Sequence, residues 1–235
     1  MRPTPNDFSF SLFGFPTNIQ PFFWLVAALI SAVSIGMIDN MQIWIAKMLV
    51  GIVGVLLAIL VHELGHAFTF RYVFHAPCAI VLHGFGGAAI PLQHYARGDG
   101  FRGMVANCFL AFSGPLAGFI LAFVMITVLR ATPADERLVT QLFLFFLQWT
   151  AVISIFWGIF NLLPIYPMDG GHISREFFTF LFPRRGVEYS LLMSMTLAIP
   201  LAIYGLLCWE PLITFIFAYF AIQNYQALTG RSLWR

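Results

Sequence analysis

Charged residues are scarce in this chain: Asp, Glu, Lys and Arg make up only 9% of its 235 residues, whereas hydrophobic residues make up 60%. A soluble globular domain carries roughly a quarter charged residues, so this composition excludes that class and indicates a polytopic membrane protein. The formal net charge of +2 and the lack of a basic cluster also exclude a nucleic-acid-binding protein. We therefore expect the lipid bilayer to be a partner of the chain and nucleic acid not to be one.

Cysteine is rare as well, and the three cysteines are too scattered to form a disulfide framework. The segment from Met1 to Gln20 lacks the continuous apolar core of a secretory signal peptide. The sequence shows no low-complexity run and no internal repeat with a period of about 20–50 residues. These absences lead us to treat residues 1–235 as a single integral-membrane domain.

Six apolar runs are long enough to cross a bilayer as helices, which takes about 20 residues. They extend approximately over Pro21–Ile38, Lys47–Phe70, Met104–Leu129, Leu138–Leu163, Val187–Leu207 and Pro211–Leu228.

The basic residues predict how these runs are oriented. With the N-terminus in the cytosol, three basic residues, Lys47, Arg130 and Arg137, fall on the outer side and nine arginines on the cytosolic side. The nine are Arg2, Arg71, Arg97, Arg102, Arg175, Arg184, Arg185, Arg231 and Arg235. This distribution obeys the positive-inside rule. We therefore expect a multi-pass protein of the cell membrane with both termini in the cytosol.

Three short segments do not fit a spanning helix. Phe8–Leu12 alternates apolar and polar residues, as a surface strand does, and we expect Gly14 and Pro16 to end it. Cys78–Leu82 and Ala88–Leu92 flank a glycine-rich turn, which predicts a β-hairpin. The sequence therefore predicts an all-α polytopic membrane protein of about six transmembrane helices. It also predicts a small membrane-surface β-sheet made of the N-terminal strand and the hairpin.

The end of the second apolar run carries a motif with metal-site spacing. His62 and His66 are four residues apart, so both imidazoles lie on one helix face and can reach a single metal ion. Glu63 lies beside them and can take a proton from water at the metal. Ionisable groups within a membrane helix are energetically unfavourable and usually functional. The alternative is a histidine pair that only packs against neighbouring helices.

A catalytic zinc commonly has three protein ligands, so a third ligand is expected from elsewhere. Asp169 is the best candidate, because it follows a helix end broken by two prolines and precedes two glycines that let the backbone turn it inward. His172, His94 and His83 are competitors, and the segment around Asp169 also fits a plain turn. In the topology above, the second and fourth runs both end on the cytosolic side. Asp169 and the histidine pair are therefore expected at a similar depth.

The two stretches together resemble the site-2 protease family of intramembrane zinc metalloproteases, peptidase family M50. The family pattern is H-E-x-x-H in one transmembrane helix and N-x-x-P-x-x-x-x-D-G near the end of a later one. Here these stand as His62–His66 and Asn161–Gly170, with Met168 where leucine is more usual. Ser113-Gly114-Pro115 is also similar to the family, and we assign this small-residue stretch to close helix packing.

The resemblance implies a zinc ion held by His62, His66 and Asp169, with Glu63 as the general base. Asn161 would hold the substrate strand or polarise its carbonyl group. The implied activity is hydrolysis of peptide bonds in or near transmembrane helices of other proteins, by a minimal core without a PDZ insertion or a C-terminal regulatory domain.

Two other functions stay open at this point, a metal transporter within the membrane and a non-catalytic membrane scaffold of the same fold. Neither explains Glu63. The role of the hairpin also stays open. In one interpretation, an unwound substrate segment adds to the edge of the hairpin as a further strand. In the other, the hairpin only fills the loop between two spans.

Overall fold

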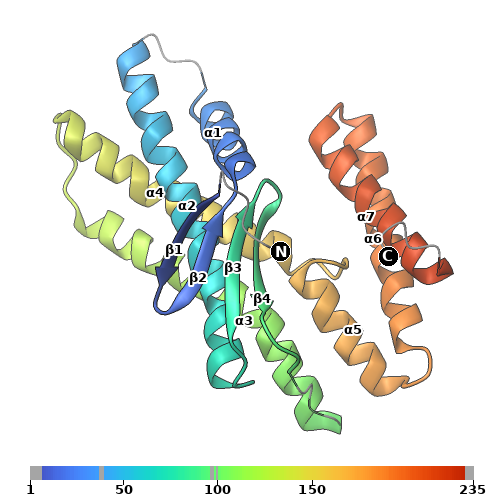
Figure 1. Cartoon of the computed structure of the whole chain (residues 1–235). Helices are drawn as coiled ribbons and strands as arrows, with labels where there is room; N and C mark the ends of the chain where they lie inside the picture. Colours follow the sequence, from blue (N-terminus) through green and yellow to red (C-terminus); the bar gives the residue numbers. More distant parts are fainter. Residues whose placement is uncertain (1–6, 37–39, 96–97, 99, 231–235) are drawn as a thin grey trace. The chain divides into compact units, whose positions relative to one another are not determined.

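The structure is a computed structural model that describes residues 7–36, 40–95, 98 and 100–230 (Figure 1). In this part of the chain the helices are α1 (Pro21–Ile35), α2 (Met41–Tyr72), α3 (Gly100–Ala131), α4 (Leu138–Asn161), α5 (Asp169–Leu181), α6 (Gly186–Leu207) and α7 (Pro211–Thr229). The strands are β1 (Phe8–Leu12), β2 (Phe15–Ile19), β3 (Cys78–His83) and β4 (Gly86–Pro91). The described residues divide into two compact units. The first takes in the chain up to position 96 with Ser113–Ile159, and the second takes in Arg97–Phe112 with Phe160–Arg235.

The prediction of a mainly helical multi-pass membrane protein is confirmed, because α2, α3, α4 and α6 are long and apolar enough to cross a bilayer. The first and last predicted spans are also helical, as α1 and α7, but neither is among these four. Six spans and the cytosolic position of both termini therefore stay predictions. Residues 37–39, at the predicted end of the first span, and residues 231–235 lie outside the described residues.

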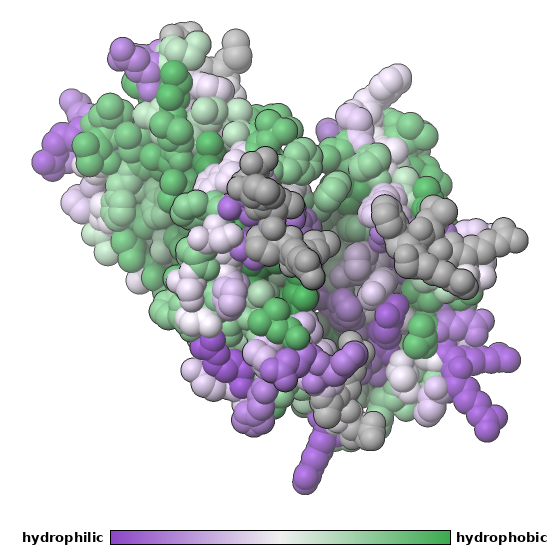
Figure 2. Space-filling model, viewed as in Figure 1, coloured by the Kyte–Doolittle hydropathy of each residue, from purple (hydrophilic) through white to green (hydrophobic). Residues whose placement is uncertain are grey.

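The helices of the first unit present large hydrophobic side chains outward, as lipid-facing helices do. Figure 2 shows hydrophobic residues covering the region that α1, α2 and α4 occupy in Figure 1. Exposed examples are Leu25, Leu29 and Val33 of α1, Leu49 and Val53 of α2, and Val139, Val152 and Phe156 of α4. Lipid is a solvent for these side chains, so their exposure agrees with a membrane location.

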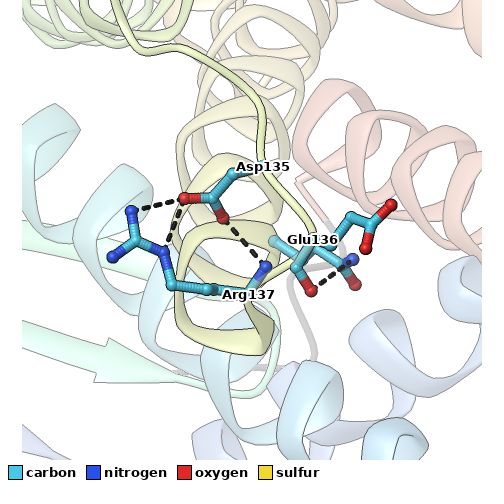
Figure 3. A network of polar contacts seen from close by, with 4 residues as sticks. Asp135, Glu136 and Arg137 are labelled. Atoms are coloured by element: carbon cyan, nitrogen blue, oxygen red, sulfur yellow. Dashed lines mark hydrogen bonds and ion pairs between the residues drawn. The ribbon is translucent and has the colours of Figure 1, made fainter.

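The loop between α3 and α4 is polar, and its charged residues bind one another (Figure 3). Asp135 accepts hydrogen bonds from Nε of Arg137 at 2.7 Å and from its backbone N–H at 2.9 Å. Hydrogen bonding from Arg137 lowers the pKa of the Asp135 carboxyl below its usual value. The Asp135 carboxylate therefore stays charged near neutral pH, which suits a loop at the aqueous end of two spanning helices.

The four strands form one mixed sheet in the order β1-β2-β3-β4. β1 and β2 are antiparallel, as are β3 and β4, while β2 and β3 are parallel. The prediction that the N-terminal strand and the hairpin form one sheet is confirmed. Phe15, Ile19, Ile80 and Leu82 are almost fully buried and form the centre of the sheet's packed face.

The predicted strand Phe8–Leu12 is β1 and ends before Gly14 as expected, but the strand β2 that follows it was not predicted. A tight turn at Phe13 and Gly14, both with positive φ, returns the chain into β2. Proline is tolerated in β2 because Pro16 precedes the parallel ladder with β3, which begins at Thr17.

The C-terminal end of α2 is tied to the β1–β2 turn by one side chain. Arg71 donates a hydrogen bond from Nη1 to the Phe13 carbonyl oxygen at 2.8 Å, and its guanidinium lies 3.5 Å from the centre of the Phe15 ring. The sheet also packs directly on α2 through β3 and β4. These contacts fix the sheet against the part of α2 that carries the histidine motif.

In the second unit, α6 and α7 pack on each other along their length, and α5 packs on α6. Ile165, Met168, Ala198 and Phe217 form a buried cluster there. Helix α5 was not predicted from the sequence, because two prolines precede it and its first turn contains Gly170 and Gly171. The glycines serve packing instead. A Cβ at Gly170 would collide with the Leu162 carbonyl, so the start of α5 lies directly on the preceding loop.

Candidate metal site

Helix α2 places three ionisable side chains in its buried C-terminal part. The helix begins at an Asn40 cap, whose side chain accepts hydrogen bonds from two backbone N–H groups, and it continues unbroken for 32 residues. His62 and Glu63 are each 3% exposed, and His66 is 8% exposed. The predicted placement of the motif on one helix is thus confirmed.

The two imidazoles are arranged for a single metal ion. Their Nε2 atoms are 3.3 Å apart, with the rings nearly perpendicular at 76°. Two nitrogen ligands at 2.0–2.1 Å from a tetrahedral zinc ion would be about 3.3–3.4 Å apart. The observed separation therefore fits zinc coordination by both Nε2 atoms, which packing alone would not require.

The Ser113–Gly114 segment of α3 lies directly against this histidine pair. The Ser113 hydroxyl oxygen is 3.5 Å from Nδ1 of His66, so it is placed to accept that ring's N–H and leave Nε2 as the ligand atom. A Cβ at Gly114 would lie 2.8 Å from Nε2 of His62 and would collide with Nε2 of His66. Gly114 therefore keeps open the space beside both ligand atoms.

This contact was not predicted from the sequence, although the predicted close helix packing of the segment is confirmed. A Cβ at Gly65 would collide with the Ser113 carbonyl, so α2 and α3 do approach closely here. One signal for this contact was present in the sequence. The polar Ser113, followed by Gly114 and Pro115, interrupts an otherwise apolar helix.

Strand β4 approaches Glu63 from another side. A Cβ at Gly87 would collide with Cγ of Glu63 and would lie 2.7 Å from its Oε1. The neighbouring Gly86 packs in the same manner on the Trp157 ring. β4 is also the last strand in the sheet order, so its outer edge faces no further strand among the described residues. The free edge of the sheet therefore begins near Gly87, beside the predicted general base Glu63.

Asp169 is half-buried and is the first residue of α5, while Asn161 is the last residue of α4. One ligand atom from each of His62, His66 and Asp169 lies within 4.8 Å of the others, a group consistent with a zinc site. The competitors His83, His94 and His172 are not part of this group. His83 instead accepts a hydrogen bond at Nδ1 from the Phe85 N–H at 3.2 Å, and the His172 ring packs on Tyr166.

Cys78 in β3 is close to α2 in space but is not part of the group of His62, His66 and Asp169. Burial raises the pKa of its thiol to about 11, with Arg71 acting weakly in the opposite direction. The thiol donates to the Ala67 carbonyl oxygen at 3.7 Å. Cys78 is 2% exposed and packs as a small core residue.

Comparisons with known proteins agree with this site. Residues 131–201 match Peptidase family M50, a range that contains Asn161 and Asp169. The "Zinc metalloprotease MJ0392" of Methanocaldococcus jannaschii is 24% identical over 218 residues, which cover 92% of this chain and 59% of that protein. The "Putative zinc metalloprotease Rip3" of Mycobacterium tuberculosis is 30% identical over 129 residues, which cover 54% of this chain and 30% of that protein.

The structure is also similar to that of the "Site-2 Protease from Methanocaldococcus jannaschii", with a TM-score of 0.60 and 21% identity over 94% of this chain and 95% of the other. Over the matched ranges the chain is homologous to zinc metalloproteases of peptidase family M50, and it shares the site-2 protease fold. It spans about three fifths of the length of the archaeal relative and under a third of the mycobacterial one.

Proposed function

We propose that the chain is an intramembrane zinc metalloendopeptidase that hydrolyses peptide bonds in or near transmembrane helices of other membrane proteins. The observation that carries this proposal is the 3.3 Å separation of the two Nε2 atoms on a membrane helix, with Glu63 buried beside them. The similarity to zinc metalloproteases supports it. A transporter or a scaffold would leave the buried carboxylate of Glu63 without a role.

His62, His66 and Asp169 would hold the zinc ion. When bound, zinc acidifies water and polarises a carbonyl group. Glu63 accepts the proton of the attacking water and delivers it to the leaving amine. The close approach of β4 at Gly87 restricts the Glu63 side chain, which keeps the carboxylate in one position for both proton transfers. Asn161 holds the substrate backbone or polarises the carbonyl group that is attacked.

The substrate of such an enzyme is a transmembrane helix, whose peptide groups are occupied by internal hydrogen bonds. The helix must unwind locally before attack, and in lipid the released N–H and C=O groups need new partners. The outer edge of β4 offers a row of backbone donors and acceptors that begins beside Glu63. An unwound segment adds to this edge as a further strand. The other possibility, a hairpin that only fills the loop, would leave the approach to Glu63 unused.

A metal-dependence experiment tests the proposal. The wild-type protein, purified in detergent, should bind one zinc ion per chain and cleave a single-span membrane substrate. Chelation should stop cleavage, and added zinc should restore it. Full cleavage by protein shown to be free of metal would refute the proposal.

A further inference from the structure

Two fully buried polar side chains of the second unit bind the loop that precedes Asp169. Ser194 lies in the middle of α6 and Asn224 in α7, and both are 0% exposed. A buried polar side chain in an otherwise apolar helix is destabilising unless it is hydrogen-bonded. Both side chains reach out of their own helices to the loop between α4 and α5.

The two side chains bind opposite ends of one residue of that loop. The Tyr166 N–H donates to the Ser194 hydroxyl oxygen at 3.0 Å, and the Tyr166 carbonyl oxygen accepts from Nδ2 of Asn224 at 2.6 Å. Ser194 also donates to the Ser190 carbonyl oxygen, and Asn224 to the Phe220 carbonyl oxygen. Each side chain thus links its own helix backbone to the Tyr166 backbone.

The loop needs such partners because its own backbone hydrogen bonds, from Ile165 to Leu163 and from Met168 to Ile165, do not include Tyr166. Pro164 and Pro167 interrupt the helix and supply no N–H groups. A non-helical backbone at membrane depth is tolerated only where protein groups bind it. Ser194 and Asn224 provide these groups from two separate helices.

The side chain of Tyr166 also has close contacts, both of them with α5. The Arg175 guanidinium lies 3.8 Å from the ring centre, and the His172 ring packs edge-on with centroids 5.0 Å apart. Both partners belong to α5, which begins at Asp169. A Cβ at Gly171 would collide with the Tyr166 backbone, so the first turn of α5 lies directly on this residue. Tyr166 is therefore a fixed point for α5, α6 and α7.

The geometry points to Ser194 and Asn224 as positioning residues for the predicted metal ligand Asp169. Asp169 follows Tyr166 by three residues, so a displaced Tyr166 backbone displaces the start of α5 and the carboxylate it carries. This inference rests on the proposed role of Asp169 in zinc binding. It assigns His172, a competing ligand in the sequence, to holding the Tyr166 ring.

Matched substitutions on α6 test the inference. Ser194→Ala removes the bond to Tyr166. Ser190→Ala removes an equally buried hydroxyl whose bond, at 2.9 Å, goes only to the Val187 carbonyl of its own helix. Ser194→Ala and Asn224→Leu should each lower zinc affinity by about tenfold or more, the range for groups that orient a ligand. Ser190→Ala should leave zinc affinity unchanged. Zinc affinity is measured by chelator competition in detergent, and the cobalt(II) absorption spectrum reports ligand geometry.

A second pair separates the hydroxyl from packing. Threonine and valine have nearly the same volume, so Ser194→Thr should retain zinc affinity and the wild-type cobalt spectrum, whereas Ser194→Val should not. An equal loss in both variants would assign the effect to packing and overturn the inference.

Hydrogen exchange of the metal-free protein gives a readout that does not depend on zinc. The Tyr166 amide should exchange faster in Ser194→Ala than in wild type, and should be unaffected in Ser190→Ala. If wild type binds zinc and Ser194→Ala matches Ser190→Ala in both measurements, the positioning inference is wrong and the zinc site stands. If wild type binds no zinc, the proposed function fails, and with it the assignment of Ser194 and Asn224 to positioning a ligand.

Discussion

Replacing Gly114 with alanine should weaken zinc binding, because Gly114 lies against the ligand atoms of both histidines. The new Cβ would lie 2.8 Å from Nε2 of His62, and it would come still closer to Nε2 of His66. To reach 3.4 Å, where ordinary van der Waals contact begins, the His62 ring would have to move by about 0.6 Å. Plausible zinc–ligand distances vary by only about 0.2 Å, so the shift disrupts the ligand geometry.

We expect Gly114→Ala to lower zinc affinity by about 10- to 100-fold, as loss of a group that orients a metal ligand does. The assay is competition with a chelator on protein purified in detergent, together with thermal unfolding of the metal-free protein. Gly118→Ala is the matched control. It lies on the same helix, and its Cβ would meet the Ser154 carbonyl oxygen at a tolerable 3.4 Å. Wild-type zinc affinity in a folded Gly114→Ala protein would refute the reasoning.

Three further predictions concern the third ligand, the topology and the sheet edge. Asp169→Ala should lower zinc occupancy, measured by metal analysis, far more than His172→Ala, and the reverse order would reject the ligand assignment. A membrane-impermeant thiol reagent should label single cysteines placed in Thr132–Asp135 from outside intact cells, but not one placed at Ser232, whose labelling would reject the N-in topology. Prolines placed one at a time along β4 should abolish cleavage at alternate positions while zinc content stays normal. Uniform tolerance of proline there would exclude strand addition.

The sequence predicted those features that depend on local spacing. The four-residue spacing of His62 and His66 fixes their relation on a helix, and the structure places their Nε2 atoms 3.3 Å apart. The lengths of the apolar runs predicted the helices, and the alternation around a glycine turn predicted the β3–β4 hairpin. The catalytic role of Glu63 and the role of Asn161 stay predictions, because both concern steps of a reaction.

The features that the sequence missed depend on close contacts between distant segments. The strand β2 was missed because proline is normally a strand breaker, and only the partner β3 shows that Pro16 lies outside the parallel ladder. The contacts of Gly114 with the histidines and of Gly87 with Glu63 join residues more than 20 positions apart. No periodicity encodes such contacts. Helix α5 was missed because its first glycines, which favour turns in isolation, are required here for packing on the Tyr166 loop.

The central claim, a zinc protease with Glu63 as its base, is tested most directly by Glu63→Gln. The substitution keeps the size of the side chain and leaves His62, His66 and Asp169 in place, so zinc stoichiometry should stay that of wild type. Cleavage of a single-span substrate should fall by about 10²- to 10⁴-fold, the usual contribution of general acid–base catalysis. The same substitution at the exposed Glu188 is the control and should change neither quantity. Wild-type cleavage by zinc-loaded Glu63→Gln protein would contradict the account.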